Sequence, residues 1–276
     1  MARQNQVRPP GVAGLFYPSD KVALERELSL MLENSPRLDL PRPVRGSIVP
    51  HAGIVYSGGV AARAYRQLIG IDYEVIAVVA LSHVEQYPMA TVYPGRALQT
   101  PLGEVPLDTA LAREITTRYP QIRLSIQGYA SDEHSLEVQL PFIQWVQPNT
   151  PILPLMMGEQ SPEAIDLLTE ALTNILKGRN FLIIGTTDLS HYYPSVYARA
   201  LDQVAINDVE RFSPERLLED IREQRCEMCS YGAALVAMRV AKAAGAQDAR
   251  VLLYRNSGDI SGDHSRVVGY LAAIFY

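Results

Sequence analysis

Two unbroken apolar runs limit what this chain can fold into. Residues 74–81 read EVIAVVAL and residues 181–185 read FLIIG. A strand with this pattern is buried on both faces, as in a parallel sheet that is covered by helices. Segments with helical spacing of apolar residues alternate with such strands along the chain. The alternation predicts an α/β fold, with one αβα domain over residues 1–276 and a mainly parallel central sheet flanked by helices.

The same patterns predict the other elements of this domain. Further strands are expected at residues 46–49, 152–156, 250–254 and 267–274. Helices are expected at residues 21–34, 58–68, 107–118, 135–146, 161–177, 195–211, 214–223 and 231–244. Pro141 lies late in one of these helices and predicts a kink there.

Composition excludes several classes of function. The 276 residues include 25 basic and 30 acidic side chains, for a net charge of −5, so neither nucleic acid nor a membrane surface is expected as a partner. Apolar residues make up 47% of the chain, which rules out disorder as its main state. No apolar stretch is long enough to span a bilayer, and the N-terminus lacks an apolar signal core. The chain has 2 cysteines, close together, so a reducing cytoplasmic setting is expected.

Three of the histidines stand in the same place relative to a strand. His51 follows GSIVP, His83 follows EVIAVVALS, and His191 follows FLIIGTTDLS. In an open parallel sheet the carboxyl ends of the strands form one edge, and ligands bind in the crevice there. One such histidine could simply bond to a loop carbonyl, but three in the same place predict a shared cleft.

A cluster of histidines at one sheet edge predicts a metal site, because neutral imidazole is a common ligand for zinc, copper and iron. Two histidines need an anionic partner, for which the sequence offers the Asp188 carboxylate or the Cys226 thiolate. Cys226 and Cys229 have CxxC spacing, but a structural zinc site needs four ligands, so a zinc knuckle is not expected. Either cysteine could instead be a small buried apolar residue.

His134 precedes an apolar helical segment, within the sequence DEHSLE. At a helix start the macrodipole disfavours a cation, so His134 is expected to be neutral and to serve as a ligand or a base. The alternative is a purely structural role. The chain has no GxGxxG, P-loop or GxSxG motif, so neither a phosphate-binding loop nor a serine hydrolase is predicted. The polar loop at residues 256–264 either rims the cleft or is a surface turn.

Several motifs occur in an order that is typical of one family. They are VRPPGVAGLFYP, VPHAGIVYSG, SHV, SDEHSLEVQLPF, GTTDLSHYYP and SGDISGDHSRVVGY. With these motifs the chain resembles the Memo family (mediator of ErbB2-driven cell motility), which in prokaryotes includes AmmeMemoRadiSam system protein B. The resemblance covers essentially the whole chain. It implies a fold similar to that of the class III extradiol ring-cleaving dioxygenases, which use non-haem iron(II).

The resemblance also implies roles for individual residues. His51, His83 and Cys226 match the family's metal centre, and Asp188 and His191 match two further residues of its cleft. In the related dioxygenases the histidine in the position of His191 acts as acid or base, and a carboxylate completes the iron site. A thiolate is a softer ligand, which favours copper(I), zinc or a differently tuned iron. With the resemblance to iron enzymes, we expect iron(II) or copper first, with zinc as the alternative. Animal Memo proteins have a histidine near the position of Cys229, so the resemblance assigns Cys229 no role.

Three functions are consistent with these expectations. The first is a dioxygenase-like oxidoreductase that acts on a small organic substrate, aromatic ones included, with His191, Asp188 and His134 as catalytic residues. The second is a metal-assisted hydrolase in which Asp188 orients a metal-bound water. The third is a non-catalytic module that binds a peptide or protein in the cleft, although no arginine cluster surrounds the histidine motifs. The family often accompanies radical-SAM and AMMECR-type proteins, which are the expected functional partners.

Overall fold

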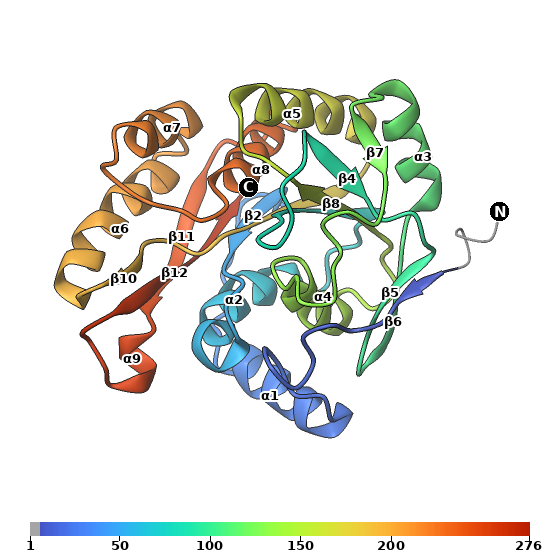
Figure 1. The fold of residues 1–276 in the computed structure, drawn as a ribbon. Helices are drawn as coiled ribbons and strands as arrows, with labels where there is room; N and C mark the ends of the chain where they lie inside the picture. Colours follow the sequence, from blue (N-terminus) through green and yellow to red (C-terminus); the bar gives the residue numbers. More distant parts are fainter. Residues whose placement is uncertain (1–5) are drawn as a thin grey trace.

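The computed structural model describes residues 6–276 and contains a central sheet between layers of helices (Figure 1). Its middle strands are parallel and lie in the order β2 (Gly46–Val49), β9 (Phe181–Thr186), β3 (Val75–Leu81) and β8 (Ile152–Met157). Almost all side chains of these strands are buried, because helices cover both faces of the sheet. This burial explains the unbroken apolar runs in the sequence. The predicted α/β fold with a helix-flanked sheet is confirmed.

The strands outside this centre are largely antiparallel. β12 (Val267–Phe275) pairs with β2, and both β11 (Ala249–Asn256) and β10 (His191–Tyr193) pair with β12, all in antiparallel directions. On the other side, β4 (Ala90–Val92) is antiparallel to β8 and parallel to β7 (Ile122–Leu124). The sheet is therefore parallel at its centre rather than over most of its width. Strand direction depends on the course of the connections, which apolar periodicity does not encode.

Helices pack on the two faces of the sheet around separate apolar clusters (Figure 1). One face carries α1 (Lys21–Glu33), α2 (Ile54–Leu68) and α4 (Leu140–Val146). The other face carries α3 (Thr109–Arg118), α5 (Pro162–Leu176), α6 (Ser195–Glu210), α7 (Pro214–Arg222) and α8 (Tyr231–Ala243). A short helix, α9 (Gly258–Ser261), follows β11 in the polar loop. Within residues 6–276, no helix combines the length and apolar character needed to cross a membrane.

Pro141 begins a helix rather than bending one. The segment predicted as a single helix is a 3₁₀ turn at Glu137–Gln139 followed by α4, and Pro141 lies in the first turn of α4. Proline fits there because an N–H group in the first turn has no acceptor within the helix. The kink predicted at Pro141 is therefore wrong, and the residues before Glu137 form a loop.

A small second sheet lies near the N-terminal end of the described chain. It consists of β1 (Val7–Arg8), β5 (Ala97–Thr100) and β6 (Gly103–Pro106). These strands are short, and in β6 Val105 is buried between the exposed residues Glu104 and Pro106. No apolar run marks them in the sequence, which explains why they were not predicted.

Candidate metal centre

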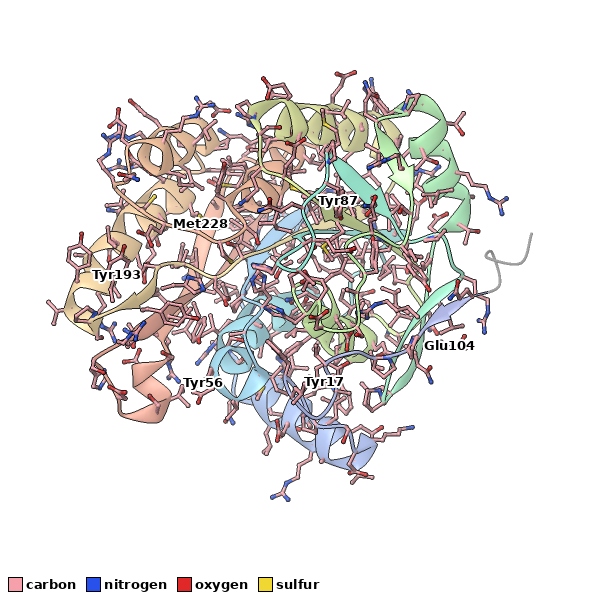
Figure 2. The ribbon with its side chains drawn as sticks, viewed as in Figure 1. Tyr17, Tyr56, Tyr87, Glu104, Tyr193 and Met228 are labelled. Atoms are coloured by element: carbon pink, nitrogen blue, oxygen red, sulfur yellow. The ribbon has the colours of Figure 1, made fainter. Side chains whose placement is uncertain are left out.

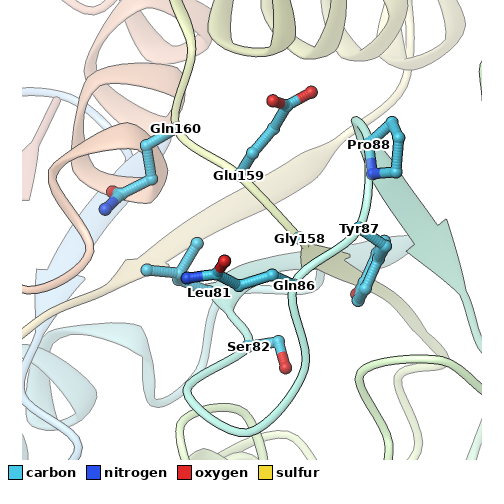
Figure 3. Close-up of a pocket in the computed structure, with 8 residues that line it drawn as sticks. All are labelled: Leu81, Ser82, Gln86, Tyr87, Pro88, Gly158, Glu159 and Gln160. Carbon is cyan, nitrogen blue, oxygen red and sulfur yellow. The ribbon is translucent and has the colours of Figure 1, made fainter.

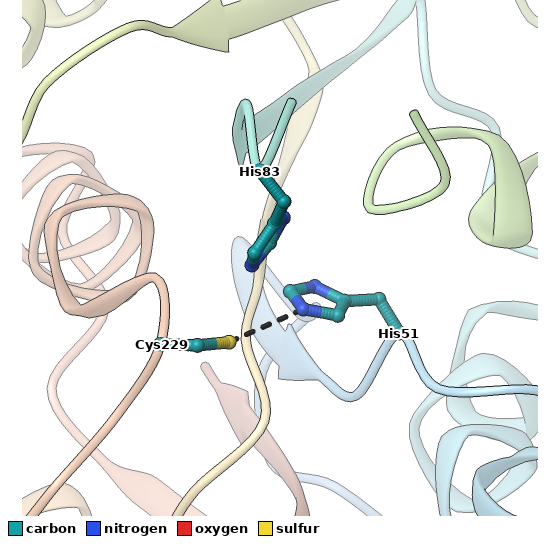
Figure 4. Close-up of side chains that lie close together, drawn as sticks. All are labelled: His51, His83 and Cys229. Carbon is teal, nitrogen blue, oxygen red and sulfur yellow. Dashed lines mark hydrogen bonds between the residues drawn. The ribbon is translucent and has the colours of Figure 1, made fainter. Parts of the chain in front are cut away.

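Two histidines and one cysteine meet at the carboxyl end of the parallel strands. His51 lies between β2 and α2, His83 follows β3, and Cys229 lies in the loop between α7 and α8 (Figure 4). Each contributes an imidazole nitrogen or the Sγ atom, and these atoms all lie within 4.8 Å of one another. His51 is buried, His83 is exposed and Cys229 is half-buried. The structure thus brings His51 and His83 together as expected, in a place that solvent can reach.

The cysteine at this cluster is Cys229, which corrects the prediction of Cys226. Cys226 is 1% exposed and packs in the apolar cluster around α8. Burial, helped by the nearby carboxylate of Asp208, raises the pKa of its thiol to about 12. Cys226 therefore stays a protonated thiol at neutral pH, whereas a metal ligand must be a thiolate. The alternative given for either cysteine, a small buried apolar residue, describes Cys226.

Backbone hydrogen bonds to Asp188 hold Cys229 at the site. The N–H of Cys229 donates to the carbonyl of Asp188 over 3.1 Å. The N–H of Asp188 donates in turn to Sγ of Cys229 over 3.2 Å. The segment that follows β9 therefore fixes the place of this side chain.

Thr186, the last residue of β9, orients the ring of His51. Its Oγ1 lies 2.9 Å from Nδ1 of His51, and it also accepts a hydrogen bond from Nε2 of Gln139 over 3.1 Å. The same hydroxyl can donate to the carbonyl of Ser135, 3.3 Å away. With its proton used there, the hydroxyl accepts from His51, so the ring is protonated at Nδ1. The lone pair on Nε2 then faces Sγ of Cys229, 3.2 Å away.

A buried carboxylate, Glu133, supports His83. The N–H of His83 donates to Oε2 of Glu133 over 2.5 Å, and Nδ1 of His83 lies 3.7 Å from Oε1. Ser135 donates to the same carboxylate through its hydroxyl and its N–H. Burial raises the pKa of Glu133, but these hydrogen bonds outweigh it and lower the pKa to about 2. The sequence analysis assigned no role to Glu133. The pattern that could have indicated one is an acid, an imidazole and a hydroxyl on consecutive residues, Glu133, His134 and Ser135.

The pKa of His83 reflects the negative groups around it. Burial alone would lower this pKa, but hydrogen bonds to Cys229 and Glu133 raise it to about 9. Without a bound cation, the imidazole of His83 is therefore protonated at neutral pH. A metal ion in the same place would take over the role of that proton, because both are cations held by the same anionic groups.

His134 is the third histidine of the cluster. The centroid of its ring lies 5.5 Å from that of His51 and 5.2 Å from that of His83, and the ring stacks on Phe16 at 4.4 Å. Burial and the neighbouring His51 lower its pKa to about 4, so the ring is neutral at pH 7. The expected neutral state is present, but the reason differs from the expected one. No helix starts at His134, so the macrodipole is not the cause.

Asp188 and His191 lie in different environments. Oδ1 of Asp188 accepts the N–H of His51 over 2.9 Å, which places this carboxylate directly at the site. His191 begins β10, where its Nδ1 lies 2.7 Å from the carbonyl of Leu189 and its ring contacts Tyr192. In the described part of the chain, the ring of His191 makes no contact with the rings of His51, His83 and His134. The roles predicted for Asp188 and His191 stay predictions.

A cavity of about 520 Å³ is lined by residues that neighbour His83 in the sequence or contact the Cys229 segment (Figure 3). Ser82, which precedes His83, lines it on one side, and Gln160 lines it on another. Nε2 of Gln160 donates to the carbonyl of Cys229 over 3.0 Å. Gln86 and Glu159 add further polar groups to its wall. The cavity is therefore in contact with the segments that hold two of the three clustered side chains.

An ion pair holds the loop that carries Glu133 and His134. Arg8 pairs with Glu137, and both side chains are almost fully buried. Glu137 also accepts the hydroxyl of Tyr17 over 2.6 Å (Tyr17 is labelled in Figure 2). Arg8 donates further to the carbonyls of residues 129, 130 and 133. The N-terminal segment thus fixes the start of the loop.

Comparison with known proteins agrees with this picture. The family model described as "Memo-like protein" matches residues 8–274. A MEMO1 family protein of Aquifex aeolicus is 36% identical over 272 residues, which cover 98% of this chain and 99% of the relative. One of Methanothermobacter thermautotrophicus is 34% identical, over 96% and 98% of the two chains.

A solved structure shares the fold at much lower sequence identity. It is the crystal structure of an uncharacterized protein from Escherichia coli, with a TM-score of 0.57 and 13% identity. The match covers 83% of this chain and 99% of the other. Identity at that level shows the fold alone, whereas the family model and the relatives cover nearly the whole chain. The chain therefore belongs to the Memo family.

Proposed function

We propose that this chain is a metal-dependent redox enzyme that acts on a small organic substrate, aromatic ones included. The observation that carries the proposal is the meeting of His51, His83 and Cys229, whose ligand atoms lie within 4.8 Å of one another. Three protein ligands leave part of the coordination of an ion open, which is typical of catalytic rather than structural sites.

The distances and donor types suit a transition-metal ion. Metal–nitrogen bonds of about 2.0–2.1 Å and metal–sulfur bonds of about 2.3 Å put neighbouring ligand atoms about 3.5 Å apart in a tetrahedral site. Nε2 of His51 and Sγ of Cys229 are 3.2 Å apart, so a small adjustment admits an ion. Imidazole with thiolate suits iron, copper and zinc. We place iron(II) or copper first, because the sequence resembles a group related to iron dioxygenases, and zinc second.

The remaining residues supply positioning and proton transfer. A bound redox ion would supply electron transfer and an open position for a substrate atom. His134 is a weak base at a pKa of about 4, so its neutral ring suits hydrogen bonding that orients a substrate. We assign proton transfer to His191, as the resemblance implies, and positioning of His51 to Asp188. The cavity beside Ser82 gives the substrate a place to bind.

Metal analysis tests the proposal directly. Protein purified without a histidine tag and under anaerobic conditions should contain iron or copper at about one ion per chain. Cys229→Ser should lose most of this metal. Cys226→Ser is the matched control, because it removes a thiol from the same loop and should keep the metal. Zinc in place of iron or copper would contradict redox chemistry and favour the hydrolase, and a metal-free protein would favour the binding module.

A second variant separates a ligand from a proton carrier. His191→Ala should keep its metal, because His191 is not among the clustered ligand atoms. Its turnover should fall by about 10²–10⁴-fold, the usual contribution of a general acid or base. Loss of metal in this variant, to the extent seen in His51→Ala, would make His191 a ligand and overturn this assignment.

A further inference from the structure

A second cavity, of about 560 Å³, lies at the end of the sheet opposite the metal centre. Arg45 lines it just before β2, and Phe181 lines it as the first residue of β9. The turn that follows α5 and the last residues of α8 complete the wall. Sites for small organic molecules commonly have volumes of about 300–1,000 Å³.

The back of this cavity is apolar. Leu176, Phe181 and Val240 line it, and all three belong to the buried apolar cluster between the sheet and the helices α5 and α8. Ala243 and Ala244 add small side chains at the end of α8. Such a surface excludes water from an apolar group that binds against it, which favours a ligand with a hydrocarbon or aromatic body.

The rim of the cavity is cationic. Arg45, Lys177 and Arg179 are its ionisable groups, and none of the described residues that line it is acidic. The whole chain has a net charge of −5, so a cavity rim with only basic ionisable groups differs in charge from the chain as a whole. One guanidinium nitrogen of Arg45 donates a hydrogen bond to Oδ1 of Asn180, over 2.7 Å. Within the described residues, Lys177 has no hydrogen bond or ion pair.

These cations are not used up in capping the helices. The last turn of α8 is closed by its own backbone, since the N–H groups of Ala244 and Ala246 donate to Val240 and Ala241. At the end of α5, only Nε of Arg179 donates to a helix carbonyl, that of Ile175, over 3.3 Å. Arg179 also forms an ion pair with Glu114, over 3.9 Å. Lys177 and the remaining nitrogens of Arg45 are therefore the donors most available to an anionic group.

We propose that this cavity binds a small amphipathic anion, with its apolar body against Phe181 and Val240 and one carboxylate or phosphate group at Arg45, Lys177 and Arg179. Three elements join the cavity to the metal centre. β2 connects Arg45 to His51, β9 connects Phe181 to Thr186, and α8 runs from the Cys229 loop to the cavity. The site is separate from the metal centre and stands whether or not the metal proposal holds.

Binding of a fluorescent aromatic anion, anilinonaphthalene sulfonate, tests the site. It should bind the folded protein at about one per chain, more weakly at high salt, and more tightly than its uncharged analogue N-phenylnaphthylamine. Lys177→Met with Arg179→Met should weaken binding by about tenfold or more, if each cation contributes at the upper end of surface ion pairs. Lys21→Met, which removes an exposed lysine from α1, is the control and should change nothing.

A second variant fills the cavity without changing charge. Ala243→Trp should abolish binding of the dye while circular dichroism shows the native helix content. Displacement of the dye by octanoate but not by octyl phosphate would identify a carboxylate site, and the reverse would identify a phosphate site. Octanol, which has no charge, should not displace the dye. Dye binding that survives both Ala243→Trp and the double lysine–arginine variant, or equal binding of the uncharged analogue, would overturn the proposal.

Discussion

Sγ of Cys229 lies 3.2 Å from Nε2 of His51, although the two residues are 178 positions apart in the sequence. Asp188 connects them. Its N–H donates to the sulfur, and its carboxylate accepts the N–H of His51. Asp188, the second residue after β9, therefore sets the separation between two of the three clustered ligand atoms.

Two substitutions of Asp188 should separate the effect of its hydrogen bond to His51 from the effect of its negative charge. Asp188→Asn keeps an oxygen that can accept the His51 N–H, so metal affinity should change less than about threefold. Asp188→Ala removes the acceptor and should weaken binding by about 10-fold or more, as other outer-shell changes do. Both affinities can be measured by competition with a metal-sensitive dye. If Asn weakened binding as much as Ala, the negative charge rather than the hydrogen bond would matter.

Thr186→Val should reduce metal affinity by about 10–100-fold, because Nδ1 of His51 loses the hydroxyl that fixes its ring and tautomer. The variant also leaves Nε2 of Gln139 with one partner fewer, at a cost of about 1–3 kcal/mol in the free energy of unfolding. Thr150→Val is the control, since Thr150 is buried elsewhere and bonds to Gln147. It should lower stability without changing metal affinity.

Metal binding should strengthen as the pH rises from about 6 to about 9. In the metal-free protein the pKa of His83 is about 9, so below that pH a proton must leave before the imidazole can bind an ion. Affinity should therefore fall by about tenfold per pH unit below pH 9 from this group alone. Glu133→Gln removes an anionic partner, lowers the pKa of His83 and should shift the curve to lower pH. Identical curves would show that Glu133 does not control this proton.

Arg8→Met should be among the most destabilising single changes in the N-terminal segment. It leaves the carboxylate of Glu137, whose side chain is 1% exposed, without its cation, at a cost of about 3–5 kcal/mol in the free energy of unfolding. Arg96→Met is the matched control, because the Arg96–Glu104 pair is 48% and 44% exposed and should contribute less than about 1 kcal/mol. Urea unfolding measures both, and similar losses would contradict the buried role of Arg8.

The sequence was most informative where a side chain directly follows a buried strand. His51 and His83 come soon after β2 and β3, so the parallel pairing of those strands through β9 is enough to bring them to one edge. His191 also follows β9, but the segment before it pairs with β12, where the N–H of Leu189 donates to Gly269. That antiparallel pairing carries His191 into β10, and no pattern in the sequence marks it.

The positions of Cys229 and His134 at the cluster depend on long-range contacts, which cannot be recognised in the sequence. CxxC spacing does not say which sulfur points to the cleft; the backbone bonds between Cys229 and Asp188 decide it. His134 reaches the cluster because Arg8 and Glu137, 129 positions apart, hold its loop. Each of these contacts joins segments that become neighbours only once the sheet has formed.

X-ray absorption spectroscopy of the iron- or copper-loaded protein tests the central claim most directly. We predict one sulfur scatterer at about 2.3 Å in the unmodified protein and in Cys226→Ser, and none in Cys229→Ser. Loss of the sulfur signal in Cys226→Ser, or its absence from the unmodified protein, would contradict a metal centre formed by His51, His83 and Cys229.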